Sequence, residues 1–190
     1  YLFEVPLPYG SAGRTLTFTA TVTDSVGQTA SAGPVQAVVV ADVTAPTVSF
    51  QLPAAGAQVV AGLQLPVQLV ADDNIEVVAV TLKVNGAVFG TLATPPFQTS
   101  YAVGKSLAGT TLVFEATAVD TSGNTASATV SVGVIADAPP LVSLSAPAQA
   151  TEGVGAVLTA SASDDVALTS VDFEVGPSAG ALVSVGRKFN

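Results

Sequence analysis

Residues 14–32 read RTLTFTATVTDSVGQTASA and residues 110–128 read TTLVFEATAVDTSGNTASA, so one pattern occurs twice in the chain at an offset of 96. From Leu16 to Thr23, an apolar residue alternates with a threonine. Strict alternation with a β-branched polar residue on one side predicts a half-buried antiparallel strand. The Asp and Gly that follow predict a turn, and the shared TASA begins the next strand.

Two further matches follow in the same order along the chain. The stretch at 40–50 resembles that at 135–144, and VADD at 70–73 resembles ASDD at 162–165 with an offset of 92. Segments that mix core, turn and linker residues therefore recur with a period of roughly 95 residues. The predicted division is residues 1–42 as the C-terminal part of one unit, 43–137 as a complete unit, and 138–190 as the N-terminal part of a further unit.

Each unit is expected to be a set of short strands separated by turns. Alternating apolar residues predict a strand at 78–84, and Asn85-Gly86 directly after it is a strong hairpin signal, since both turn residues must accept positive φ. About seven short strands in roughly 95 residues predict an all-β fold of tandem immunoglobulin-like antiparallel β-sandwiches, with the outer two units partial. Without Cys or Trp, the sheets must be held by aliphatic packing around Phe18, Phe114 and Phe173.

The complete unit resembles the bacterial immunoglobulin-like (Big-type) repeat domains of secreted and cell-surface, adhesin-like proteins. The residues that carry the resemblance are DVTAPTV at 42–48, PAAG at 53–56, ADDNI at 71–75, KVNG at 83–86 with GT at 90–91, PPF at 95–97 and AVDTSGNTA at 118–126. The resemblance implies tandem arrays that act as stalks in adhesins, as spacers in large extracellular proteins or as accessory modules beside enzymes. It says little about a ligand, because this fold hosts many roles.

Composition excludes several classes of function. The chain of 190 residues contains no Cys and no His, which excludes disulfides, thiol or imidazole catalysis and ordinary zinc, copper or haem sites. Five Lys and Arg against 14 Asp and Glu leave no basic patch for nucleic acid. No apolar run approaches the roughly 20 residues needed to cross a bilayer. We therefore expect no catalysis, no nucleic-acid partner and no membrane insertion in this segment.

The aspartates are the most informative chemical feature. Eight of the nine occupy recurring turn or linker positions, and only Asp172 falls within a predicted strand. In a seven-stranded sandwich, the entering chain and the turns after the second and sixth strands lie at the same pole. The candidate metal ligands that should converge at the two unit entrances are Asp42, Asp72, Asp73 and Asp120 at the first, and Asp137, Asp164 and Asp165 at the second.

Two interpretations of these aspartates remain open. Carboxylates that lie close together repel one another unless their charge is neutralised, and a ligand set made only of oxygens suits Ca²⁺. Ca²⁺ is therefore the candidate cofactor at each unit junction. Its affinity should be weak, with a dissociation constant on the order of 10⁻⁴ to 10⁻³ M. Alternatively, Asp and Asn are common turn residues whose side chains bond to nearby backbone N–H groups. Asp120 would then serve only a hairpin turn, and Asp72-Asp73 only an Asx turn.

Other candidate sites are weaker. Lys83 and Lys105 suggest an isopeptide crosslink, but Lys83 is out of phase with the apolar residues of its strand and should point to solvent. Glu76 and Glu115 suggest a carboxylate pair for glycoside cleavage, but nothing places them opposite each other. The threonine-rich strand faces carry little charge, which favours lateral self-association into a fibre or, alternatively, a hydrated or O-glycosylated stalk.

The sequence thus predicts a non-catalytic structural or adhesive stalk segment of a large bacterial extracellular protein. The first ten residues lack the basic start and apolar core of a signal peptide, so we expect an interior segment of a secreted or cell-surface protein. Its expected partners are neighbouring repeats of the same chain and, through a distal domain, a cell-surface or glycan ligand. The alternatives are an accessory carbohydrate-binding module of a secreted enzyme and a subunit of a surface fibre or sheath.

Overall fold

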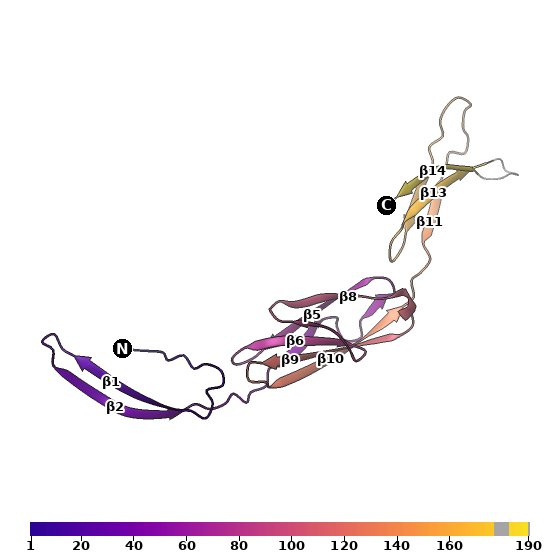
Figure 1. Cartoon of the computed structure of the whole chain (residues 1–190). Helices are drawn as coiled ribbons and strands as arrows, with labels where there is room; N and C mark the ends of the chain where they lie inside the picture. The colour runs from indigo at the N-terminus through magenta and orange to yellow at the C-terminus, as the bar shows by residue number, and fades with distance from the viewer. Residues whose placement is uncertain (177–182, 190) are drawn as a thin grey trace. The chain divides into compact units, whose positions relative to one another are not determined.

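The structure is a computed structural model that describes residues 1–176 and 183–189, and its regular secondary structure there is β-strand apart from one short 3₁₀ turn (Figure 1). The elements are β1 (Thr15–Thr23), β2 (Thr29–Val38), β3 (Thr47–Leu52), β4 (Gln58–Val60), β5 (Gln64–Asp72), β6 (Val77–Val84), β7 (Ala87–Leu92), β8 (Phe97–Ala102), the 3₁₀ turn η1 (Lys105–Leu107), β9 (Thr111–Asp120), β10 (Thr125–Ile135), β11 (Leu141–Ser145), β12 (Thr159–Ser163), β13 (Ser170–Val175) and β14 (Val183–Phe189). The predicted all-β class is confirmed.

Hydrogen bonding arranges the strands between residues 47 and 135 in two sheets. The larger has the order β4-β10-β9-β6-β7, and the smaller has the order β3-β5-β8. In the larger sheet β6 is antiparallel to both β7 and β9, whereas β4 is parallel to β10. Two sheets with these strand pairings are the architecture expected of an immunoglobulin-like sandwich.

The remaining strands pair only two by two in the part of the chain that the structure describes. β1 pairs with β2, β11 with β12 and β13 with β14, each antiparallel. These pairs lie in the two segments that the sequence predicts to be partial units.

The chain divides into two compact units that do not follow the predicted boundaries. One comprises residues 1–51, 68–98 and 114–129, and the other comprises residues 52–67, 99–113 and 130–190. The strands β3, β5, β8, β9 and β10 each contribute residues to both. The three-part division at residues 42 and 137 therefore stays a prediction.

Both units have an apolar core, and the buried aliphatic and aromatic side chains among the described residues lie between 59 and 134, while Pro46 and Pro53 are also buried. The first unit buries Leu69, Val80, Leu82, Val84, Phe97, Phe114, Ala116 and Ala118, and the second buries Val59, Ala61, Leu65, Val67, Val103, Leu112, Val130, Val132 and Val134. Full burial of a Val, Leu or Phe side chain contributes about 1.5–3 kcal/mol. Phe114 and Phe97 are buried, whereas Phe18 is 39 % exposed.

The hairpin predicted at Asn85-Gly86 joins β6 to β7. Asn85 has φ 49° and Gly86 has φ 81°, which is the left-handed conformation that a two-residue hairpin turn requires. The turn fixes the register of the pair, in which Val84 lies opposite Ala87.

Candidate functional site

Two groups of three aspartates bring carboxylate oxygens close together, one group in each unit. Asp42, Asp73 and Asp120 form the first cluster, and Asp137, Asp164 and Asp165 form the second. In each cluster one carboxylate oxygen of every member lies within 4.8 Å of the others. Oxygens that ligate one Ca²⁺ at 2.3–2.6 Å are at most about 5 Å apart, so both clusters have dimensions that suit this ion.

In the first cluster, Asp42 comes from the linker before β3, Asp73 directly follows β5, and Asp120 ends β9. The predicted convergence of the linker with two turns is therefore present. Asp120 is only 3 % exposed, while Asp42 and Asp73 are half-buried.

Asp120 holds a turn through its two carboxylate oxygens. Its Oδ1 accepts the backbone N–H groups of Ser122 and Asn124, both at 2.8 Å, and its Oδ2 accepts Nδ2–H of Asn124 at 2.7 Å. Burial raises the pKa of Asp120, but the hydrogen bonds from Asn124 and Ser122 outweigh it, so this pKa lies below its ordinary value.

The matching residue Asp24 shows that this turn forms without a cluster. Its Oδ1 accepts the backbone N–H groups of Val26 at 2.9 Å and Gln28 at 2.8 Å, in the same pattern as Asp120. Among the described residues, no second or third carboxylate joins Asp24 in a group. The turn interpretation therefore accounts for the hydrogen bonds from the backbone to Asp24 and Asp120. It does not explain why two further carboxylates lie close to that of Asp120.

Asp42 and Asp73 each use one oxygen in a turn and leave the other without a partner. Asp42 Oδ1 accepts the backbone N–H of Thr44 at 3.0 Å and Nδ2–H of Asn74 at 3.3 Å. Asp73 Oδ2 accepts the backbone N–H of Ile75 at 3.0 Å. Asp42 Oδ2 and Asp73 Oδ1 are buried, and no group among the described residues donates a hydrogen bond to either atom. The buried Thr121 Oγ1 likewise has no partner in that part of the chain.

Asn124 is a residue of this site that the sequence analysis missed. Besides Asp120, its Nδ2 donates to the carbonyl oxygen of Thr44 at 3.1 Å and to that of Asp42 at 3.3 Å, so it ties the linker to the turn after β9. The available signal was a difference within the repeat, because Gln28 stands at the corresponding position of the first copy.

The second cluster joins another linker to another turn. Asp137 lies in the linker before β11, and Asp164 and Asp165 directly follow β12. Asp164 Oδ2 accepts the backbone N–H groups of Val166 at 3.3 Å and Ala167 at 3.0 Å, and the Asp165 carboxylate accepts the backbone N–H of Ala138 at 3.3 Å.

Charge repulsion is apparent in this second cluster. Burial, together with the neighbouring carboxylates of Asp165 and Asp164, raises the pKa of Asp137 above its ordinary value, and the ammonium group of Lys105 opposes this only in part. The cluster thus favours an added positive charge.

Asp72 lies outside both clusters. It is the last residue of β5, is exposed, and offers its carbonyl oxygen to Thr47 Oγ1 at 3.2 Å. The sequence match at an offset of 92 is one residue wrong here, because β5 ends at Asp72 whereas β12 ends at Ser163, an offset of 91. Asp73 therefore corresponds to Asp164, and each accepts the backbone N–H two residues later.

The weaker candidates have separate partners. Lys83 and Glu115 form a half-exposed ion pair at 3.3 Å, and Tyr9 donates its hydroxyl to Glu76 at 3.3 Å. The acids Glu76 and Glu115 are thus engaged with different groups.

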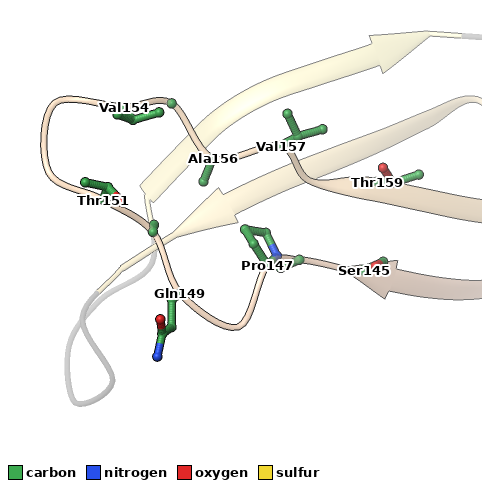
Figure 2. Close-up of a pocket in the computed structure, with 11 residues that line it drawn as sticks. Ser145, Pro147, Gln149, Thr151, Val154, Ala156, Val157 and Thr159 are labelled. Carbon is green, nitrogen blue, oxygen red and sulfur yellow. The ribbon is translucent and has the colours of Figure 1, made fainter.

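An open pocket lies in the loop between β11 and β12. Figure 2 shows Pro147, Gln149, Val154 and Val157 among the side chains that line it. None of its lining residues carries a charge, so they supply no acid or base. Within residues 1–176 and 183–189, no helix has the length and hydropathy needed to cross a bilayer.

Residues 46–132 match the family model of the bacterial Ig domain. This range extends from the residue before β3 into β10, so it contains the two larger sheets almost completely. The resemblance predicted from the sequence is therefore confirmed for this segment. No curated protein matches the chain.

Solved structures similar to this chain include the fibronectin(III)-like modules of CbhA from Clostridium thermocellum, with 19 % identity and a TM-score of 0.47, over 67 % of this chain and 65 % of that chain. Another is a Ca²⁺-stabilized adhesin that helps an Antarctic bacterium to reach out and bind ice, with 20 % identity and a TM-score of 0.37, over 92 % of this chain and 56 % of that chain. The chain thus spans less than two thirds of either structure.

Proposed function

We propose that this chain is a non-catalytic spacer segment of a bacterial extracellular or surface protein, and that Ca²⁺ bound at its linkers stiffens it. The bacterial Ig domain at residues 46–132 supports the structural and extracellular part of the proposal. The two acidic clusters, each containing one linker aspartate, support the calcium part.

The observation that carries the calcium proposal is the pair of buried oxygens without donors, Asp42 Oδ2 and Asp73 Oδ1. A buried polar atom without a partner is costly, and an ionised carboxylate costs more than a neutral group. A turn explains only the other oxygen of each residue. A hard cation that accepts several oxygens would satisfy both unpartnered atoms at once.

Such an ion would fix the linker to the sandwich. Asp42 is in the linker, whereas Asp73 and Asp120 follow two separate strands, so shared ligation would hold the linker at both strand ends. Asn124 already bonds to two linker carbonyl groups in the same place. Pro46 also restricts the backbone of this linker.

The second linker also combines an aspartate and prolines with aspartates that follow a strand, but their hydrogen bonds differ. Asp137 precedes Pro139-Pro140, and Asp165 accepts the backbone N–H of Ala138 from across the cluster. Ca²⁺ would replace the repulsion among Asp137, Asp164 and Asp165 by attraction to a common ion. A stalk made of such joints would hold a distal binding domain away from the cell surface.

The test is a Ca²⁺ titration of the chain, followed by calorimetry and thermal melting, with Mg²⁺ and a chelator as controls. For a site with a dissociation constant near 10⁻⁴ M, about 10 mM Ca²⁺ should stabilise the folded state by about 2.7 kcal/mol. Mg²⁺ should give a smaller effect, because it requires octahedral geometry and gives up its water reluctantly. An unchanged melting temperature together with no binding heat would overturn the calcium part and leave the family assignment intact.

A further inference from the structure

The loop that precedes β1 and the loop that precedes β9 are held to the chain in the same way. The backbone N–H of Gly13 donates to the carbonyl oxygen of Val39 at 2.8 Å. At the corresponding position of the second copy, the backbone N–H of Gly109 donates to the carbonyl oxygen of Val134, also at 2.8 Å. Each of these two valines lies three residues before the linker aspartate of a cluster. The hydrogen bonds therefore hold both loops close to a linker.

In both loops, the residue four positions before this glycine reaches a turn that follows a strand. Tyr9 donates its hydroxyl to Glu76, in the turn after β5, at 3.3 Å. Lys105 corresponds to Tyr9 at the offset of 96. Its Cε lies 3.5 Å from the position that a Cβ would take on Gly62, and Cγ1 of Val166, in the turn after β12, lies 3.8 Å from the same position. The end of the Lys105 side chain is therefore near the turn after β12.

This turn carries two members of the second cluster. The backbone N–H of Val166 donates to Asp164 Oδ2 at 3.3 Å, and Asp165 lies between these two residues in the sequence. Burial and the two neighbouring carboxylates raise the pKa of Asp137, and the ammonium group of Lys105 opposes this increase. Lys105 thus acts electrostatically on the cluster from a position beside its turn.

The two joints differ in charge at this position, where a joint means a linker together with the loop and the turn that lie against it. In the first joint the loop residue is the neutral Tyr9, and its partner Glu76 is an acid. In the second joint the loop residue is the cationic Lys105, and Ala167 stands where Glu76 stands in the first, at the offset of 91. The second joint therefore contains a cation where the first contains a neutral hydroxyl.

We propose that Lys105 is a built-in counter-cation of the second cluster and competes with a metal ion for it. Without a metal ion, the ammonium group partly neutralises the three carboxylates. Lys105 is exposed, so its ammonium group can move into solvent when Ca²⁺ binds. The second cluster then binds Ca²⁺ more weakly than it would without the lysine. The competition rests on the proposed function, whereas the role as counter-cation does not.

Carbodiimide coupling tests the contact directly, because it joins a lysine amine to an adjacent carboxylate through an amide that mass spectrometry locates. In chelator, Lys105 should couple to an aspartate of the second cluster. About 10 mM Ca²⁺ should suppress this product, because the ion engages the carboxylates and displaces the amine. The ion pair of Lys83 with Glu115 at 3.3 Å is the matched control in the same sample, and its product should form equally with and without Ca²⁺.

The outcomes separate this proposal from the calcium site itself. Formation of the Lys83–Glu115 product without any Lys105 product in chelator would overturn the role as counter-cation. A Lys105 product that Ca²⁺ leaves unchanged, in a chain whose second cluster binds Ca²⁺, would overturn the competition. A chain that couples Lys105 in chelator but binds no Ca²⁺ would support the counter-cation and refute the proposed calcium site.

Calorimetry measures the effect of the lysine on affinity. Asp73→Asn removes a carboxylate of the first cluster, so that in this background the heat of Ca²⁺ binding reports on the second cluster. In that background, Lys105→Gln should raise the affinity for Ca²⁺ about two- to fivefold, since an exposed charge acts through water and salt. Lys83→Gln removes the same charge from β6 and should leave the affinity unchanged. Equal effects of the two substitutions would reduce the result to net charge and overturn the proposal.

Discussion

The two oxygens of a single carboxylate serve different purposes in this protein. In Asp73, Oδ2 closes a turn with the backbone N–H of Ile75, and Oδ1 is buried with no donor. Its neighbour Asp72 is exposed and takes no part in the cluster. Adjacent residues at a strand end point in opposite directions, which explains why the two aspartates differ.

This difference gives a prediction for a matched pair of substitutions. Asp73→Asn should abolish most of the rise in melting temperature that Ca²⁺ produces, because one of three clustered carboxylates is lost. Without Ca²⁺, the same substitution should leave stability unchanged or increase it, since it removes a buried charge that lacks a partner.

Asp72→Asn should melt as the unmodified chain does, both with and without Ca²⁺. Scanning calorimetry of the three proteins in chelator and in about 10 mM Ca²⁺ measures both effects. Equal calcium responses of Asp72→Asn and Asp73→Asn would contradict the cluster assignment.

The contributions of Asp120 and Asp137 to folding stability should change with pH in opposite directions. The folded pKa of Asp120 lies below the ordinary value of 3.8, so its stabilisation is present above that value and is lost as pH falls through the folded pKa. The folded pKa of Asp137 lies above 3.8, so the fold loses stability as pH rises from that value through the folded pKa.

In chelator, Asp120→Asn should therefore lower the melting temperature near neutral pH and have little effect in acid. Asp137→Asn should raise the melting temperature near neutral pH by relieving repulsion. Melting curves from about pH 2 to about pH 7 measure both trends. A shift of the same sign for both variants would contradict the assigned causes.

The element that recurs most clearly is the hairpin, and its two copies differ in what surrounds them. Phe114 is fully buried, and its counterpart Phe18 is 39 % exposed. Identical residues in the same hairpin conformation can therefore contribute very different amounts to stability.

Truncation of these two phenylalanines should separate the contribution of core packing to stability from that of intrinsic strand propensity. Phe114→Ala should lower the free energy of unfolding by about 3–5 kcal/mol, because it leaves a cavity in the core. Phe18→Ala should lower it by less than about 1 kcal/mol, because this side chain is already 39 % exposed. Denaturant unfolding measures both losses, and comparable values would contradict the difference in burial between the two side chains.

Sequence patterns predicted these elements because alternation and turn residues act locally. The strand before Asn85-Gly86, the hairpins at Asp24 and Asp120 and the linker positions of Asp42 and Asp137 follow from such patterns. Contacts between distant parts of the chain did not follow. Asn124 reaches the linker across about 80 residues, and no local pattern indicates this.

The position of Asp72 illustrates the same limit. Sequence alignment naturally places the aspartate pair at 72–73 on the pair at 164–165. The position of the strand end, however, decides which aspartate of a pair points toward the cluster. A shift of one residue reverses the direction of a strand side chain, so alignment alone could not separate Asp72 from Asp73.

For the whole molecule, the two linkers are the places where calcium would alter behaviour. Each contributes one aspartate to a cluster whose other members follow strands, so an ion would restrict the rotation of the linker relative to those strands. Without an ion, the linkers should sample a broader range of conformations, restrained by their prolines and by hydrogen bonds such as Asn124 to Thr44.

Small-angle scattering coupled to size-exclusion chromatography should therefore register calcium as a change in the distance distribution of the monomer. On addition of about 10 mM Ca²⁺ the distribution should narrow and its maximum dimension should become better defined, because two flexible joints become fixed. A variant with both Asp42→Asn and Asp137→Asn should keep the calcium-free distribution under both conditions, whereas Asp72→Asn should respond as the unmodified chain does. Narrowing of the distribution in the double variant would mean that calcium acts elsewhere than at the linkers.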